Sequence, residues 1–298
     1  MLIAGPSASG KSALALSLAE KLIRAGRPAV IVNADSMQVY STLRILTARP
    51  DGGQMARAPH HLYGHVAPSE RYSVGRWLDD VGGVLAGLEG AGQLPVLVGG
   101  TGLYFRALTQ GLAALPDIPE SIRGHWRGQM AKQGPGTLHR LLAVRDPDAA
   151  ATIRPGDRQR IVRALEVIEA TGRSILTWRR QEPAPPLIDP ATALRLVVEP
   201  DRAALYRRIE RRVEAMVEAG ALDEVAALLA LDLDPDLPAM KAIGVKAFGD
   251  FLDNRILLDE AIARAKTETR QYAKRQMTWL RNQMADWERF SPRQAGPD

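Results

Sequence analysis

The residues best suited to chemistry lie in the first twelve positions of the chain. Gly5 and the triplet Gly10-Lys11-Ser12 fit the pattern Gly-x-x-x-x-Gly-Lys-Ser/Thr. In such a loop the glycines let backbone N–H groups converge on phosphate oxygens, the lysine adds a positive charge, and the serine hydroxyl can ligate Mg²⁺. The sequence therefore predicts a binding loop for a di- or triphosphate, with Ser12 as the magnesium ligand. Its members are Gly5, Pro6, Ser7, Ala8, Ser9, Gly10, Lys11 and Ser12.

Two more polar residues follow apolar runs that are typical of buried strands. Asp35 comes soon after residues 30–32, and Thr101 follows residues 95–98 and a Gly-Gly pair. Because ligands gather at the carboxyl ends of parallel strands, we expect the phosphate loop, Asp35 and Thr101 to share one cleft. A standard ATPase carries an acid after another apolar strand to help hold Mg²⁺. Residues 99–102 contain no acid, which argues against that class.

The elements that must position these residues alternate between apolar runs and helical patterns. Four short runs predict the strands of a parallel sheet, at residues 2–4, 30–32, 95–98 and 194–198. The first predicted helix covers residues 11–23, and the last runs from an N-cap at Asp259 to about Met284. The predicted fold class is therefore α/β, with a P-loop NTPase-like, three-layer parallel-sheet core.

The stretch from Pro116 to about Pro190 differs in character from the rest. It contains helical patterns and loops but no convincing strand, and prolines cluster at both of its ends. Because such clusters disfavour regular structure, they indicate hinges. We therefore expect residues 1–115 and 191–298 to form the catalytic core, and residues 116–190 to form an inserted all-helical subdomain.

Composition narrows the class of partner. The 298 residues carry a net charge of +5, which favours polyanionic partners, although arginine-rich sequences also arise without any nucleic-acid function. The chain has no Cys, which excludes disulfides and Cys-based metal sites. No apolar run approaches the roughly 20 residues that cross a bilayer, and no signal peptide is evident. We expect a cytoplasmic protein without a membrane partner.

A series of segments, in order along the chain, resembles those of the tRNA dimethylallyltransferases (tRNA isopentenyltransferases). A phosphate loop alone would be weak evidence for prenyl transfer, whereas the ordered series is specific. After that loop the segments are Asp35-Ser36-Met37-Gln38-Val39-Tyr40, His60-His61-Leu62, Val98-Gly99-Gly100-Thr101-Gly102-Leu103-Tyr104, Asp157-Arg158-Gln159-Arg160 with Arg163-Ala164-Leu165-Glu166, Ala242-Ile243-Gly244 and Ala273-Lys274-Arg275-Gln276-Met277-Thr278-Trp279-Leu280-Arg281.

The resemblance implies a reaction and its reactants. Dimethylallyl pyrophosphate would donate its five-carbon group to the N6 amine of the adenosine at tRNA position 37, beside the anticodon, and pyrophosphate would leave. The phosphate loop would bind the donor's pyrophosphate with Mg²⁺ as cofactor. Asp35 is the candidate base, because the amine must lose a proton as the new bond forms. Thr101 would orient the reactants. A monomer that binds the tRNA anticodon stem-loop is expected.

The resemblance also implies RNA-binding residues. Asp35, Ser36, Met37, Gln38 and Thr101 would face the flipped base, and Gln38 is suited to hydrogen-bond a base edge. Within the insertion the implied contacts are Arg123 and the segment Gln159, Arg160, Ile161, Val162 and Arg163. Gln159 and Arg163 share a helix face by their four-residue spacing, while Ile161 falls on the apolar face.

The sequence departs from the family pattern at three places. The family usually has a glycine where this chain has Leu46, an acid where it has Tyr63-Gly64, and an aromatic residue where it has Val245. These differences bear on loop geometry and RNA fit rather than on the reaction class. Three other readings remain open. They are a P-loop nucleoside or nucleotide kinase, an adenylate dimethylallyltransferase acting on free AMP, and a non-enzymatic RNA-binding protein.

Overall fold

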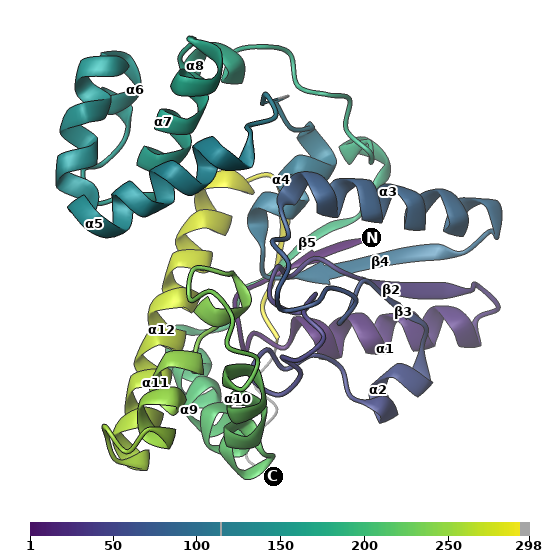
Figure 1. The fold of residues 1–298 in the computed structure, drawn as a ribbon. Helices are drawn as coiled ribbons and strands as arrows, with labels where there is room; N and C mark the ends of the chain where they lie inside the picture. The colour runs from purple at the N-terminus through teal and green to yellow at the C-terminus, as the bar shows by residue number, and fades with distance from the viewer. Residues whose placement is uncertain (114, 293–298) are drawn as a thin grey trace. The chain divides into compact units, whose positions relative to one another are not determined.

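The computed structural model describes residues 1–113 and 115–292, which group into two compact units. The first comprises Met1–Thr109 together with the chain from Leu187 onward, and the second comprises Gln110–Pro186 (Figure 1). The sequence places the junctions at 115/116 and 190/191, a few residues later in each case. Among the described residues, no helix is both long and apolar enough to cross a membrane.

The first unit is built on a six-stranded, all-parallel sheet, with strand order β3-β2-β4-β1-β5-β6. The register pairs Ala4 with Gly99 and Asn33 with Val98, so the carboxyl ends of β1, β2 and β4 lie level with one another. The strands are β1 (Leu2–Ala4), β2 (Ala29–Asn33), β3 (His60–His61), β4 (Leu94–Gly99), β5 (Arg195–Val198) and β6 (Glu288–Phe290).

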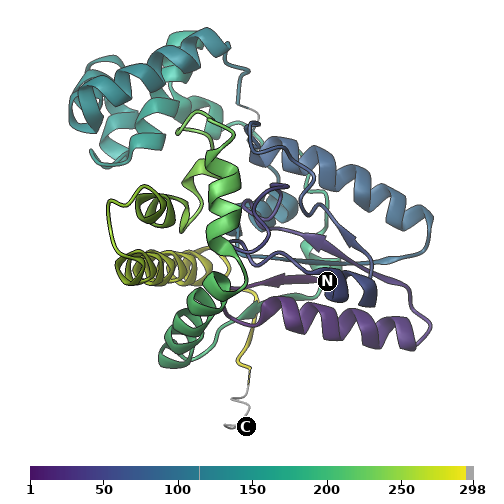
Figure 2. The ribbon, with the colours of Figure 1, turned by 60° about the horizontal axis from the view of Figure 1, so that its bottom comes forward.

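Alternate strand residues pack into two different cores, because successive side chains point to opposite faces of a sheet. Ile3, Ile31 and Val96 pack against α1 (Lys11–Arg24). Their strand neighbours pack on the other face with Trp77 of α3 (Val74–Gly90) and Phe105 of α4 (Gly102–Gln110). Figure 2 shows α1 and α3 on opposite sides of the strands. The predicted three-layer α/β core is confirmed.

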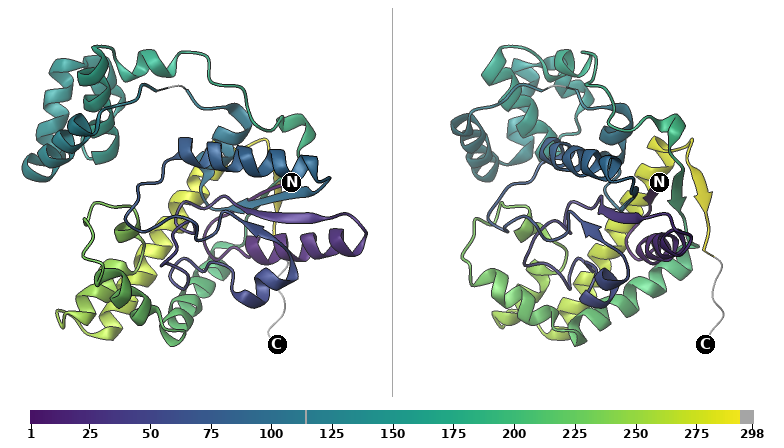
Figure 3. Two further views of the ribbon diagram at one scale, coloured as in Figure 1. Left: turned by 45° about the vertical axis from the view of Figure 1, so that its right-hand side comes forward. Right: turned by 90° about the vertical axis from the view of Figure 1, so that its right-hand side faces the viewer.

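The remaining helices of this unit lie largely after β5. Two ion pairs join α9 and α12, Lys266 with Glu214 and Arg270 with Glu210, and the two helices run close together (Figure 3). The last long helix begins at Leu258, so Asp259 lies in its first turn and is not the N-cap. The helices are α2 (Gly52–Arg57), α9 (Arg202–Glu218), α10 (Ala221–Leu229), α11 (Val245–Leu252) and α12 (Leu258–Gln283), with short 3-10 turns at Pro190–Thr192 and Ala239–Lys241.

The second unit has its own apolar core and contains no strand within its described residues. Trp126, Leu142 and Leu165 are among its buried side chains. The chain breaks the first helix at Gly134, where φ is +75° and a proline follows. The helices are α5 (Glu120–Arg145), α6 (Pro147–Thr152), α7 (Arg158–Thr171) and α8 (Ile175–Arg179).

Candidate active site

The loops that follow β1, β2 and β4 meet at one edge of the sheet. These three strands are adjacent, so the residues just past their ends must be neighbours. The backbone N–H of Gly5 donates to the carbonyl of Gly99 at 3.3 Å, and the N–H of Thr101 donates to the carbonyl of Ala34 at 3.2 Å. The structure thus brings together the phosphate loop, Asp35 and Thr101, as the strand-end rule predicts.

The phosphate loop wraps around the amino end of α1. Gly10 is the N-cap with φ of +91°, and Ala8 also has a positive φ of +62°, which is strained for a residue with a side chain. The Lys11 ammonium donates to the carbonyl of Pro6 at 3.2 Å. From α9, the guanidinium of Arg208 donates to the carbonyl of Ser9 at 3.3 Å. One hydrogen bond therefore joins the two ends of the loop, and another connects the loop to α9.

Burial makes Lys11 sensitive to a bound anion. Desolvation lowers its pKa to about 8, the Asp35 carboxylate opposes that shift, and Arg212 of α9 adds to it. Burial likewise lowers the pKa of Arg212, again opposed by Asp35. Two desolvated cations and one carboxylate thus lie within electrostatic range of one another. An anion in the loop would compensate the cost of burying both cations.

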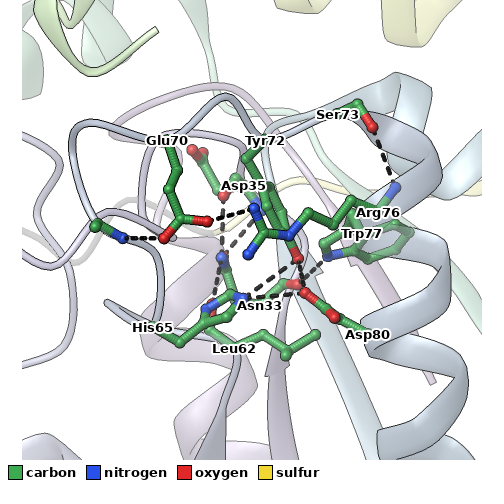
Figure 4. Close-up of polar contacts among 11 residues, drawn as sticks. Asn33, Asp35, Leu62, His65, Glu70, Tyr72, Ser73, Arg76, Trp77 and Asp80 are labelled. Carbon is green, nitrogen blue, oxygen red and sulfur yellow. Dashed lines mark hydrogen bonds and ion pairs between the residues drawn. The ribbon is translucent and has the colours of Figure 1, made fainter. Parts of the chain in front are cut away.

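A buried asparagine shapes the turn that carries Asp35 (Figure 4). The side-chain oxygen of Asn33 accepts the N–H of Asp35 at 2.9 Å, and its amide donates to the carbonyls of Asp35 and Leu62, each at 3.0 Å. The Trp77 indole donates to the Asn33 carbonyl at 3.0 Å. The Asp35 Oδ1 in turn accepts the N–H of Met37 at 3.0 Å. The carboxylate is therefore held in a defined orientation, with Oδ2 pointing away from this turn.

Thr101 holds the same turn from the neighbouring strand. Its hydroxyl oxygen accepts the N–H of Ser36 at 2.9 Å and donates to the Ser36 hydroxyl at 3.2 Å. Both residues are only partly exposed. Thr101 and the turn at Asp35 therefore form one rigid unit.

Three tyrosines lie within electrostatic range of Asp35, and the sequence motifs gave them no role. They come from the loop after β3 (Tyr63), from α4 (Tyr104) and from α12 (Tyr272). In each, burial raises the pKa, and the charge of the Asp35 carboxylate raises it further. They therefore stay neutral and add no charge to the surroundings of the Asp35 carboxylate. Tyr104 is rigid, because it stacks on Trp77 with ring centroids 4.3 Å apart.

Gln38, the predicted reader of a base edge, uses its amide nitrogen inside the protein. Its side chain is only 9% exposed, and its amide donates to the carbonyls of Thr47 at 2.8 Å and Ala48 at 3.2 Å. Both N–H groups of the amide are thus used inside the protein, where they anchor the following loop. Met37 is half-buried and packs on the core beneath the turn.

That loop contains the departure at Leu46. The Glu224 carboxylate of α10 accepts the backbone N–H groups of residues 44–46 at 2.7–2.9 Å, and the Leu46 side chain packs against the core. Tyr63 lies within electrostatic range of the Asp35 carboxylate, and Val245 is buried. The three departures therefore occupy packed positions.

The implied RNA residues of the second unit have mixed surroundings. Gln159 and Arg160 are exposed near the start of α7, whereas Val162 is partly buried in the core. Arg163 is half-exposed and pairs with Glu166 at 3.2 Å. Ile161 is fully buried, so its side chain packs in the core of this unit and its assignment as an RNA contact is wrong for this conformation.

Arg123 lies on α5 of the same unit. Its guanidinium forms an ion pair with Asp117 at 3.2 Å. Its Nε is buried and has no hydrogen-bond partner among the described residues. The side chain is therefore only partly satisfied by the protein.

The edge of the sheet also offers oxygen donors for a magnesium ion. Ser12 is exposed at the amino end of α1, and Asp35 lies within electrostatic range of the adjacent Lys11. The described residues contain no group of three or more His, Cys, Asp or Glu side chains suited to a metal. Mg²⁺ at phosphate sites needs only one or two protein ligands, because phosphate oxygens and water complete its shell. The donor set therefore fits such an ion.

A phosphate loop, a fixed carboxylate and a threonine at adjacent strand ends define the class: a P-loop-type α/β protein with a phosphate site beside a candidate proton acceptor. The comparisons narrow this class. Residues 38–283 match the model of the family described as IPP transferase. The tRNA dimethylallyltransferase of Agrobacterium fabrum is 54% identical over 293 residues, which cover 98% of this chain and 96% of that protein. The chain therefore belongs to the IPP transferase family.

Further relatives agree with this assignment. The tRNA dimethylallyltransferase of Chelativorans sp. is 56% identical over 288 residues, with 96% of this chain and 97% of that protein covered. The crystal structure of a tRNA isopentenylpyrophosphate transferase from Bacillus halodurans is 36% identical, with a TM-score of 0.67 and coverage of 97% and 88%. A eukaryotic dimethylallyltransferase acting on tRNA is 28% identical, with a TM-score of 0.77 and coverage of 97% and 73%.

Proposed function

We propose that this protein transfers a dimethylallyl group from dimethylallyl pyrophosphate to the N6 amine of the adenosine at tRNA position 37. The observation that carries the proposal is the meeting of the phosphate loop, Asp35 and Thr101 at one edge of the sheet, in a chain whose family members are named for this reaction. The C1–O bond of the donor breaks, the N6–C1 bond forms, one amine proton is taken up by the protein, and pyrophosphate leaves.

The donor half of the reaction is assigned to the phosphate loop. Its backbone N–H groups and Lys11 bind the pyrophosphate and stabilise the charge that it gains as it leaves. Arg212 supports this role, because a desolvated guanidinium near Lys11 favours an anion between them. Arg208 keeps the loop closed through its bond to Ser9.

The acceptor half is assigned to Asp35 and Thr101. The exocyclic amine of adenine is a poor nucleophile, because its lone pair is delocalised into the ring. It therefore benefits from a carboxylate within hydrogen-bond reach. The Oδ1 of Asp35 already accepts the N–H of Met37, so Oδ2 is the oxygen assigned to receive the amine proton. Thr101 keeps this turn in register with the phosphate loop.

Magnesium is the proposed cofactor, with the Ser12 hydroxyl as its protein ligand. When bound, it would neutralise charge on the leaving pyrophosphate.

The RNA is proposed to contact Gln159, Arg160 and Arg163 on α7, together with Arg123. The Arg123 side chain is 36% exposed, so its guanidinium could donate to a phosphate or ribose oxygen. The proposed substrate implies a monomeric enzyme that acts in the cytoplasm, where tRNA is modified.

The rival activities lack a supporting observation. A kinase of the ordinary P-loop type would need an acid after β4, and that strand is followed by Gly100, Thr101 and Gly102. An enzyme for free AMP would have little use for the exposed basic residues of a helical insertion. One label-transfer assay separates prenyl transfer to tRNA, prenyl transfer to AMP and phosphate transfer from ATP.

The decisive experiment supplies radioactive dimethylallyl pyrophosphate, Mg²⁺ and unmodified tRNA without ATP. The wild-type protein should label the tRNA, and Asp35→Ala should lower kcat by about 10³-fold, within the range for loss of a general base. The exposed Asp79 of α3 provides a matched control, Asp79→Ala, that should keep full activity. Label on AMP in place of tRNA, or phosphate transfer from ATP to a nucleoside, would refute the proposal.

A further inference from the structure

One face of α12 contacts the catalytic loops, although the proposed reaction gives this helix no role. Tyr272, Gln276 and Trp279 are spaced by four and three residues, so they share this face. Tyr272 lies in the field of Asp35, Gln276 bonds to two of the loops, and Trp279 lies against Gly102. The helix therefore contacts the residues past β1 and β4 and lies within electrostatic range of Asp35 past β2.

Gln276 joins the phosphate loop to the turn that precedes Thr101. Its Oε1 accepts the N–H of Ser7 at 2.9 Å, and its Nε2 donates to the carbonyl of Gly100 at 2.9 Å. The side chain is 6% exposed. The orientation of the amide is determined by its partners, because an N–H needs an acceptor and a carbonyl needs a donor. Both ends of the amide are thus used, each by a different catalytic loop.

These two bonds continue the ladder between β1 and β4. The last backbone contact of that ladder runs from the N–H of Gly5 to the carbonyl of Gly99 at 3.3 Å. Beyond it the two segments separate, because the segment after β1 forms the phosphate loop and the segment after β4 turns into α4. Gln276 occupies the next position as a substitute for a backbone pair. Without it, the N–H of Ser7 and the carbonyl of Gly100 would lose their partners in a buried place.

The glycines of the turn allow this approach. A Cβ on Gly100 would lie 2.3 Å from the Gln276 Nε2, and a Cβ on Gly102 would lie 2.1 Å from the Trp279 ring. Both distances are far below van der Waals contact. The Gly-Gly-Thr-Gly segment and the Gln-Met-Thr-Trp segment are therefore two halves of one packed unit.

We infer that Gln276 is a positioning residue for the transfer: its amide sets the distance between the donor's pyrophosphate loop and the Thr101 turn. The inference rests on the proposed function. The donor and the amine must meet within a few tenths of an ångström, and a misplacement of about 1 Å costs about 100-fold in rate. A residue that links the two loops controls this distance without touching either substrate.

The test uses two variants and a matched control in the label-transfer assay. Gln276→Met keeps the length of the side chain and removes both hydrogen bonds. Gln276→Glu keeps an acceptor for Ser7 but places a carboxylate oxygen against the carbonyl of Gly100. Gln271 lies on the same helix and is exposed, so Gln271→Met controls for the substitution itself.

Each Gln276 variant that retains the wild-type circular dichroism spectrum should lose about 100-fold in kcat, with a change in KM for dimethylallyl pyrophosphate below about threefold. The kcat losses of the Gln276 variants and of Thr101→Ala should not multiply. The double variant should lose far less kcat than the product of the two single fold-losses. A merely structural role predicts independent effects.

A folded variant with less than about a threefold loss of kcat would overturn the inference, as would multiplicative effects with Thr101→Ala. So would an equal loss in Gln271→Met. Absence of transfer by the wild-type protein would refute the proposed function itself, and it would be seen before any variant is measured.

Discussion

The sheet edge of the first unit and the exposed face of α7 in the second are both assigned to the same reaction, yet they are built differently. At the sheet edge, Asn33 of β2 accepts the N–H of Asp35, and the Thr101 hydroxyl past the neighbouring strand β4 accepts the N–H of Ser36. On α7, Gln159 and Arg160 are exposed, and Arg160 forms an ion pair with Asp157, the N-cap of the same helix. The first region is preorganised, whereas the second can adapt to an RNA surface.

This difference predicts different kinetic signatures. Changes at a preorganised site lower kcat or kcat/KM, because binding and chemistry depend on fixed geometry. Changes at an adaptable, exposed surface raise the KM for RNA and alter its salt dependence, because phosphate contacts dominate there.

After the loss of Asp35, the largest effect in this comparison is expected from Lys11→Met. The loss of a charge-assisted contact to pyrophosphate should lower kcat/KM for dimethylallyl pyrophosphate by about 100-fold, since hydrogen bonds to charged groups contribute about 1.5–3 kcal/mol. Steady-state label transfer measures this, with the exposed Lys21→Met on the same helix as the control. An unchanged kcat/KM would mean that the phosphate loop does not bind the donor.

A smaller effect is expected from Asn33→Ala, which leaves Asp35 in place but removes the bonds that orient its turn. The kcat should fall about tenfold, in line with about 1 kcal/mol for an ordinary hydrogen bond. The KM for tRNA should stay within about twofold. The exposed Asn282→Ala serves as the control, and equal kcat values for the two variants would mean that the turn orients itself.

The smallest effect is expected on α7. Arg160→Gln should raise the KM for tRNA about fivefold and reduce the slope of log KM against log salt by about one, with kcat unchanged. Titration of initial rates with tRNA at several salt concentrations measures both. Arg27→Gln, which changes an exposed charge of the first unit, is the control. A fall in kcat without a change in KM would contradict the distinction between the two regions.

Sequence patterns located the parts of the site that are local. The phosphate loop and its helix are contiguous in the sequence, and the apolar runs of β1, β2 and β4 show where these strands end. The edge strands β3 and β6 escaped detection, because His60–His61 and Glu288–Phe290 form no apolar run. The sequence also did not show how the Gln38 side chain is held. Its amide is used by Thr47 and Ala48, and no pattern in the sequence reveals such a contact.

The sequence by itself determined that a phosphate loop, Asp35 and Thr101 follow strands of a parallel sheet, because strand, turn and helix signals act over a few residues. It also determined that α7 has an apolar and a polar face. Only the tertiary structure decided that Asn33 orients Asp35, that three tyrosines from separate elements lie within electrostatic range of it, and that Gln276 joins two loops. Those contacts link residues as far as 269 positions apart, and their energies depend on the packed fold rather than on any local preference.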